Sequence, residues 1–149
     1  MSKLLGSRLL ESRLLRRGFL ALAFGVLLST AAPVAAQTPL PVADAAKFVG
    51  TWALLFEMGP QGPFTITVAV KDEGGQVAAE TSSDFDATPI KVKDISKAGD
   101  SLVLKYNAGP DGAFAIKLTL TPDGDDKMKG AVEAGDGQFS MTGAGGRKK

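Results

Sequence analysis

The chain has 149 residues, of which 44% are hydrophobic and 22% charged, and its formal net charge at pH 7 is +1. A chain of this length suits one small domain. It contains no Cys and no His, which excludes disulfides, thiol nucleophiles, imidazole bases and the zinc or haem sites that these side chains build.

The first 36 residues have the pattern of an export signal. A basic stretch ends at Arg17, an apolar run covers residues 19–28, and small residues lead up to Ala36. We predict a signal peptide over residues 1–36 with cleavage after Ala36, and therefore a bacterial protein that is periplasmic or secreted. Because the apolar run is too short to span a bilayer comfortably, a retained membrane anchor is the less favoured alternative.

The sequence Arg-Arg-Gly-Phe-Leu at positions 16–20 resembles the bacterial twin-arginine export motif. Leu15 and Ala21 depart from the residues that are usual beside that motif. The resemblance implies export of an already folded domain, and an ordinary secretory signal stays an alternative.

Removal of the signal peptide makes the remaining chain acidic. Residues 1–36 hold five basic side chains and one acidic side chain, so 12 Lys and Arg stand against 15 Asp and Glu in the rest, a net charge of −3. The sequence has no basic stripe with interleaved aromatic residues, and the basic residues 147–149 are expected to be solvated. We therefore expect no nucleic-acid partner.

Polarity alternates with a period of two from Phe48 onward, which is typical of strands with one apolar face. The alternation predicts eight strands, separated by short turns rich in Gly, Pro and Asp. Residues 37–46, with two prolines, are expected to be a linker, residues 47–145 the β domain and residues 146–149 a basic tail. The residues on the inward faces of the eight segments are Trp52, Leu54, Phe56 and Met58; Phe64, Ile66, Val68 and Val70; Val77, Ala79 and Thr81; Thr88, Ile90 and Val92; Leu102, Leu104 and Tyr106; Phe114, Ile116, Leu118 and Leu120; Met128, Gly130 and Val132; Phe139 and Met141.

The two halves of the β domain resemble each other. The Gly-Pro-x-Gly turn at residues 59–62, with four alternating apolar residues after it, recurs fifty residues later at residues 109–112. Apolar positions before and after the two turns also agree at this offset, with one slip of a single residue. The agreement predicts an internal duplication in which four strands occur twice.

Eight hairpin-linked strands in about 110 residues can close as an up-and-down barrel or pack as a two-sheet sandwich. We favour the eight-stranded antiparallel up-and-down barrel, because every connection is short and closure removes exposed sheet edges. An outer-membrane barrel, with apolar side chains facing lipid, is a less favoured alternative because the aromatic residues form no double girdle. We therefore expect no stable membrane insertion after signal cleavage.

Gly50-Thr51-Trp52, at the start of the first strand, resembles the Gly-x-Trp opening of calycin barrels, the group that contains lipocalins, fatty-acid-binding proteins and avidins. The resemblance implies an eight-stranded meander around a pocket for a small, often apolar molecule, with the Trp at the closed end. The chain is also similar to short lipocalin-like domains of exported bacterial proteins, whose Met-Lys-Gly segments match residues 128–130. It departs from lipocalins in its shorter length and missing C-terminal helix, and Arg147 is expected in the tail rather than over Trp52.

Two ligand classes of these families do not fit the sequence. Fatty-acid-binding proteins commonly hold a carboxylate with buried Arg, whereas the chain after residue 36 has no Arg before Arg147. Avidins recognise biotin with several aromatic walls, whereas this chain has a single Trp and a single Tyr. The prediction is therefore an uncharged apolar ligand.

The predicted function is the binding of such a molecule inside the barrel, because pockets of this kind combine apolar walls with a few polar anchors. Tyr106, Thr81 and Thr88 are the polar candidates because they lie on the inward face, and Phe85 lies in a connection that can act as a lid. The alternative is a non-catalytic structural or protein-interaction module, since side chains alone can fill an eight-stranded barrel. The predicted ligand-binding residues are Trp52, Phe56, Phe64, Thr81, Phe85, Tyr106, Phe114, Met128 and Phe139.

Two acidic groups are candidates for catalytic carboxylates or a calcium loop: Asp84 with Asp86, and the cluster at residues 123–126. Both lie in turns, where Asp usually bonds to the local backbone, and the second lacks the full spacing of an EF-hand. We therefore predict no catalytic residue, no metal and no cofactor, and a protein that is not an enzyme.

Overall fold

The computed structural model describes residues 39–149. The predicted signal peptide and its cleavage site lie outside the described residues. Within the described part of the chain, no helix is both long and apolar enough to cross a membrane.

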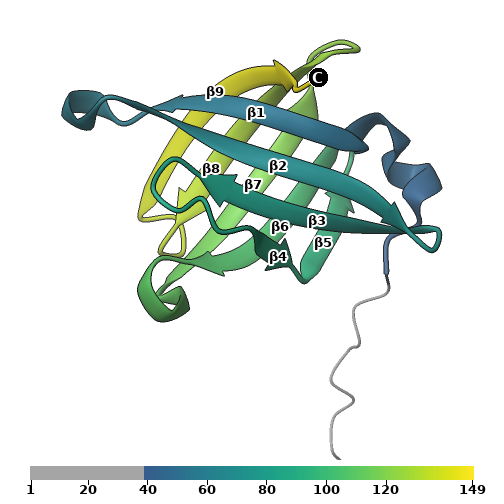
Figure 1. Ribbon diagram of the computed structural model, residues 1–149, viewed down its shortest axis with the longest axis horizontal. Helices are drawn as coiled ribbons and strands as arrows, with labels where there is room; N and C mark the ends of the chain where they lie inside the picture. The colour runs from purple at the N-terminus through teal and green to yellow at the C-terminus, as the bar shows by residue number, and fades with distance from the viewer. Residues whose placement is uncertain (1–38) are drawn as a thin grey trace, which may run out of the picture. The chain divides into compact units, whose positions relative to one another are not determined.

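The described residues form nine antiparallel strands in one sheet of order β4-β3-β2-β1-β9-β8-β7-β6-β5 (Figure 1). The antiparallel up-and-down barrel predicted from the alternation is therefore confirmed, but the number of strands is nine rather than eight. The elements are η1 (Val42–Phe48), β1 (Gly50–Glu57), η2 (Gly59–Gln61), β2 (Pro63–Glu73), β3 (Gln76–Ser83), β4 (Ile90–Val92), β5 (Asp94–Ala98), β6 (Ser101–Ala108), η3 (Pro110–Gly112), β7 (Phe114–Pro122), β8 (Lys127–Ala134) and β9 (Phe139–Arg147).

The additional strand is β5, which sequence analysis treated as a connection. β4 pairs with β3 and β5 pairs with β6, and Lys93 alone separates them along the chain. The two edge strands of the sheet are thus consecutive pieces of one bent segment, and β4 also lies beside β6. The barrel is nearly closed because the backbone at Lys93 connects the two edge strands, β4 and β5, directly. β5 escaped prediction because Ile95 is its one large apolar residue.

The predicted alternation corresponds to an inward and an outward face of the barrel. On β1, Trp52, Leu54 and Phe56 are almost completely buried, whereas Leu55 between them is 51% exposed. Each of the three buried residues pairs with a β2 residue of the same inward face, as Phe56 does with Phe64. The core therefore lies inside the barrel.

Glycines on β8 and β9 make room for the large residues of β1. Gly130 and Gly143 are paired neighbours on these strands, and both face the ring of Phe56. A Cβ atom at Gly130 would lie 2.9 Å from Cζ of Phe56, and one at Gly143 would lie 2.7 Å from its Cδ1. Both distances are shorter than carbon contacts allow, and a Cβ atom at Gly143 would also clash with the backbone oxygen of Leu55, so a side chain at either position would force its neighbours to move.

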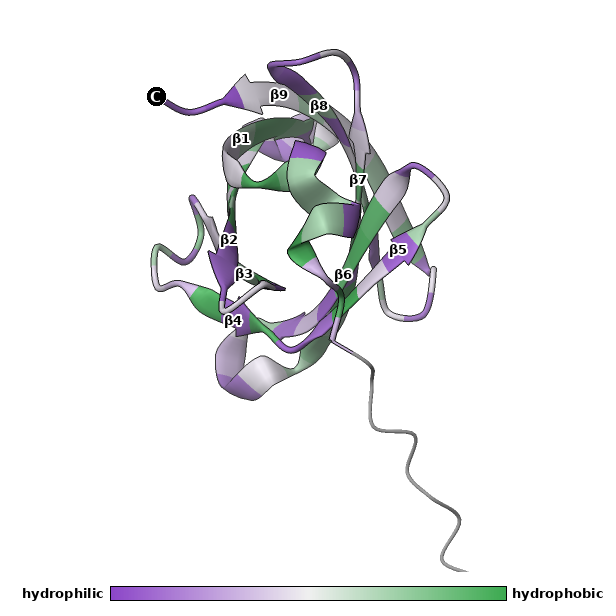
Figure 2. Cartoon of the chain, turned by 90° about the vertical axis from the view of Figure 1, so that its right-hand side faces the viewer, coloured by the Kyte–Doolittle hydropathy of each residue, from purple (hydrophilic) through white to green (hydrophobic). Residues whose placement is uncertain are grey.

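One end of the barrel is closed by η1, which lies across the opening in the view of Figure 2. Part of this segment was expected to be a linker, but Ala45 and Phe48 are buried in the core. The chain before η1 is held by backbone hydrogen bonds, in which Val77 N donates to Leu40 O and Val42 N donates to Gly75 O. The ordered part of the domain therefore begins earlier than residue 47.

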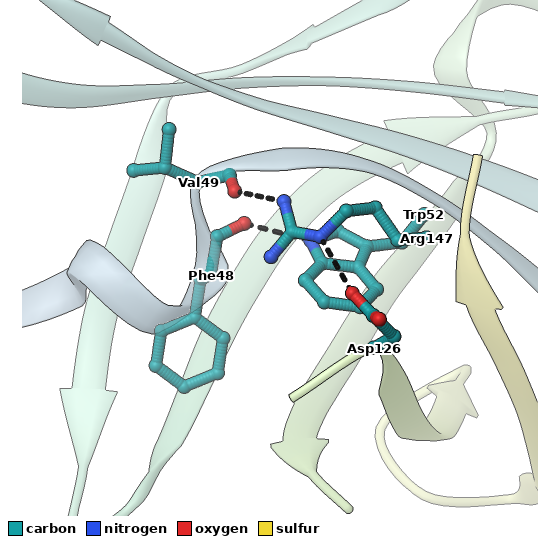
Figure 3. Close-up of polar contacts among 5 residues, drawn as sticks. All are labelled: Phe48, Val49, Trp52, Asp126 and Arg147. Carbon is teal, nitrogen blue, oxygen red and sulfur yellow. Dashed lines mark hydrogen bonds and ion pairs between the residues drawn. The ribbon is translucent and has the colours of Figure 1, made fainter. Parts of the chain in front are cut away.

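Trp52 and Arg147 complete the closed end (Figure 3). The indole Nε1 donates a hydrogen bond of 2.7 Å to Phe48 O, and Nη1 of Arg147 donates one of 2.7 Å to Val49 O. The guanidinium carbon lies 4.3 Å from the centre of the Trp52 ring, and Nε lies 3.5 Å from Oδ1 of Asp126. The expectation that Arg147 lies in a tail away from Trp52 is wrong, because β9 continues to Arg147.

Candidate ligand-binding cavity

The other end of the barrel contains a cavity of about 940 Å³. η2 and η3 lie at this end, opposite η1 (Figure 1), together with the β3–β4 loop and the β8–β9 turn, which both supply lining residues. This arrangement follows from the antiparallel meander, in which alternate connections gather at the same end. The Gly-Pro-x-Gly turns that sequence analysis singled out therefore belong to the cavity end.

The interior changes from filled to hollow along each long strand. On β6, Leu102 and Leu104 are fully buried, whereas Tyr106 lines the cavity. On β7, Leu118 is fully buried, whereas Ile116, the preceding inward residue, lines the cavity. The expectations of a packed core and of a hollow pocket are thus each met in one half of the barrel.

Aromatic rings run from the packed half to the cavity mouth. The ring centroids of Phe56 and Phe64 are 5.6 Å apart in a stacked arrangement, and those of Phe64 and Phe85 are 5.2 Å apart. These separations fall in the range of favourable aromatic pairs. Phe85, in the β3–β4 loop, is therefore anchored on the wall of the cavity rather than on the outer surface.

Three phenylalanines of the cavity lining remain open to solvent. Phe85 is 69% exposed, Phe114 56% and Phe139 47%. They belong to three different connections or strand ends, so the apolar surface surrounds the mouth instead of forming a stripe on one strand. We call these three residues the aromatic rim.

The most buried polar side chain of the cavity lining is that of Thr81 on β3. It pairs with Val68 on one side and Ile90 on the other, and it is 2% exposed. Its Oγ1 atom has no hydrogen-bond partner among residues 39–149. A buried hydroxyl normally has such a partner, so this one requires an explanation.

Tyr106 on β6 lies beside Thr81 at the floor of the cavity. Burial raises the pKa of the Tyr106 phenol, and hydrogen bonding from the Thr81 hydroxyl to the ionised phenol lowers the pKa by a smaller amount. Because Thr81 Oγ1 forms no hydrogen bond of good geometry within the described residues, the two hydroxyls are neighbours that do not satisfy each other. The phenol remains protonated and able to donate at neutral pH.

Asp86 is the one charged residue that lines the cavity within the described part of the chain. Its Oδ1 accepts a hydrogen bond of 2.9 Å from Thr88 N, and Oδ2 of Asp84 accepts one of 2.7 Å from Thr65 N. Asp86 therefore bonds to the backbone of its own loop, as the turn interpretation predicted, whereas Asp84 bonds to the backbone of β2 and ties the loop to that strand. Among residues 39–149, no three His, Cys, Asp or Glu residues are grouped so that they could hold a metal ion.

The structure divides the nine predicted ligand-binding residues into two groups. Trp52, Phe56 and Met128 do not line the cavity, because they lie in the packed half, each at most 1% exposed. Their inward faces were predicted, but alternation carries no information on depth along the barrel. The residues that line the cavity are Phe64, Thr81, Phe85, Tyr106, Phe114 and Phe139.

Sequence analysis missed several lining residues at a strand end and in the connections. Ser82 and Ser83 at the end of β3, and Pro110 and Gln138 in two connections, all contribute to the cavity surface. The signal that could have found them is the meander itself, which places the odd-numbered turns of the eight expected strands at one end. This reasoning selected Phe85 in one connection but was not extended to the residues of the other connections at that end.

No family model matches the chain, and no curated protein matches it. Among solved structures, it is similar to a redesigned beta barrel, with a TM-score of 0.50 and 18% identity over 71% of this chain and 95% of that one. It is also similar to a de novo designed fluorescence-activating beta barrel, with a TM-score of 0.47 and 19% identity over 70% and 96% of the two chains. A redesigned barrel bound to DFHBI has a TM-score of 0.46 and 14% identity over 70% and 98%. The likeness to the first structure shows the barrel fold alone.

Proposed function

We propose that this chain is a calycin-like barrel that binds one small, uncharged, apolar molecule in the cavity. The observation that carries the proposal is a hollow of about 940 Å³ with a largely apolar lining in an otherwise packed interior. Pockets for small molecules typically have about 300–1,000 Å³ and such walls with a few polar groups. The Gly50-Thr51-Trp52 opening, with Trp52 at the closed end, supports the calycin-like assignment.

The aromatic rim supports binding over a purely structural role. Phe85, Phe114 and Phe139 keep large apolar surfaces in water around one opening, and such clustered surfaces usually mark interaction sites. The packed half already supplies the barrel with its core, with Leu104 and Leu118 fully buried. A structural module has no need of the hollow half, whereas a binding protein does.

We propose binding without catalysis, in the periplasm or outside the cell. Asp86, whose carboxylate lines the cavity wall, accepts a hydrogen bond from the loop backbone. This contact stabilises the β3–β4 loop. The export signal predicted over residues 1–36 supports the location. Sequencing the N-terminus of the protein from its native envelope should show Gln37 first, and a retained Met1 would contradict export by cleavage.

Binding is tested by titrating the purified protein with Nile red, a neutral dye that fluoresces in apolar surroundings, and displacing it with lipids, quinones and carotenoids. Ala134 lines the cavity from β8, whereas Ala131 on the same strand lies in a groove on the outer surface. Ala134→Phe should remove most of the dye binding because the ring fills the cavity, and Ala131→Phe should leave it intact. Equal dye binding by both folded variants would reject the cavity as the site.

A further inference from the structure

The floor of the cavity contains a hydroxyl placed for a ligand. Thr81 is 2% exposed, lines the cavity and has no hydrogen-bond partner for Oγ1 in the described chain. Its inward neighbour on the same strand, Ala79, and its β2 partner, Val68, are buried apolar residues. A Val in place of Thr81 would have nearly the same shape and would avoid the free-energy cost of burying a hydroxyl without a partner. The position therefore carries a polar group that folding alone does not use.

A second hydroxyl lies beside it. Tyr106 follows the fully buried Leu104 on β6 by one inward position, and its ring lines the cavity beside Thr81. Each hydroxyl can donate one hydrogen bond and also accept. A single oxygen atom between them can engage both groups, either as a carbonyl that accepts twice or as a hydroxyl that accepts from one and donates to the other.

The charge around the cavity limits which classes of ligand can place an oxygen atom there. Among the described residues, the lining includes no Lys or Arg, and its one charged member is the acidic Asp86. A carboxylate or phosphate at the floor would be buried without a cation, and an unpaired buried charge is strongly unfavourable. The apolar walls above the floor, which include Phe64, Ile66 and Ile116, match a hydrocarbon body.

We propose that the ligand is an amphiphile with one neutral oxygen, an alcohol or a ketone, which enters oxygen first and binds between Thr81 and Tyr106. This inference rests on the proposed binding function. It assigns the two hydroxyls as the polar anchor of the site and excludes fatty acids as ligands. The hydrocarbon body then fills the hollow half, and its end lies at the aromatic rim.

The test is a displacement of Nile red by decane, decanol, a decanone and decanoate from the wild type and from Thr81→Val and Tyr106→Phe. Each variant should weaken decanol and decanone about tenfold, the size of one lost hydrogen bond, and leave decane unchanged. Decanoate should bind at least tenfold more weakly than decanol at neutral pH. Thr67→Val, which makes the same change on the outward face of β2, should alter none of the affinities.

Equal changes for decane and decanol in both variants, or tight binding of decanoate, would overturn the anchor while leaving the cavity as a binding site. Failure of Nile red and of every competitor to bind the folded wild type would instead reject the proposed function itself. Circular dichroism of each variant shows that it is folded. Since the two variants replace different hydroxyls, a folding defect in one leaves the other as the test.

Discussion

At the scale of single residues, Thr81 links stability to binding. Its Oγ1 is buried without a partner in the described residues, and such a group costs about 1–3 kcal/mol. We expect Thr81→Val to raise the free energy of unfolding of the ligand-free protein by about 1–2 kcal/mol, as measured by urea denaturation. A decrease in stability would mean that the hydroxyl has a partner, and it would remove the main support for the anchor.

Tyr106 is the single Tyr of the chain, so its titration can be followed directly by ultraviolet absorbance. Burial raises its pKa above the ordinary value of 10.0, and we expect a midpoint above that value in the folded protein. Between the unfolded and folded pKa values, the native state holds a proton that the unfolded state has lost, so the stability contribution present below pH 10 falls as pH rises further. Tyr106→Phe should lose this part of the pH dependence, and an ordinary midpoint in the wild type would contradict burial of the phenol.

Residue-scale properties were only partly predictable from the sequence. Thr81 and Tyr106 were singled out because they lie on the inward face, which the period of two determines. That Thr81 Oγ1 finds no partner depends on which groups of β2, β4 and β6 meet it, and these strands are distant in sequence. The period of two did not give the depth of Trp52 along the barrel, because it is the same at both ends of a strand, and the closed end was expected for this residue only from the calycin resemblance.

At the scale of elements, the closed end depends on a contact between the two ends of the domain. Arg147 of β9 packs on Trp52 and donates to Val49 O, so it connects β9 with β1 and η1. We expect Arg147→Ala to lower the free energy of unfolding by about 1–2 kcal/mol, followed in urea through the fluorescence of Trp52. Lys148→Ala, a matched change at the next residue, should alter it by less than about 0.5 kcal/mol. Equal effects would show that the contact at Arg147 contributes nothing specific.

The elements themselves were largely predictable, and the failures have physical causes. Eight strands with alternating apolar residues were identified, whereas β5 was missed because Asp94–Ala98 faces the core with few apolar side chains. The part of η1 up to residue 46 was taken as linker because Ala45 is its one buried residue and forms no periodic pattern. Arg147 was placed in a tail because β9 is rich in Gly, and Gly lowers strand propensity even where a large neighbour such as Phe56 needs the space.

At the scale of the whole molecule, the barrel separates stability from binding between its two halves. β7 crosses both halves, with Leu118 fully buried in one and Phe114 exposed at the rim of the other. We expect Leu118→Ala to lower the free energy of unfolding by about 2–5 kcal/mol, because it leaves a cavity in close packing. Phe114→Ala should lower it by less than about 1 kcal/mol and should weaken Nile red binding.

Leu55→Ala provides the control for Phe114→Ala, since Leu55 is similarly exposed, at 51%, and lies outside the cavity lining. Urea denaturation measures the stability of the three variants, and dye titration measures their binding. Leu118→Ala and Phe114→Ala compare the two halves of β7, and Leu55→Ala gives the effect of removing an exposed apolar side chain outside the cavity. If Phe114→Ala destabilised the barrel as much as Leu118→Ala, the rim would be part of the core and the hollow half would be a feature of folding. If Phe114→Ala reduced dye binding without loss of stability, the rim would belong to the binding site. The Phe114 ring is exposed to water in the free protein, so its apolar surface becomes buried only when a ligand covers it.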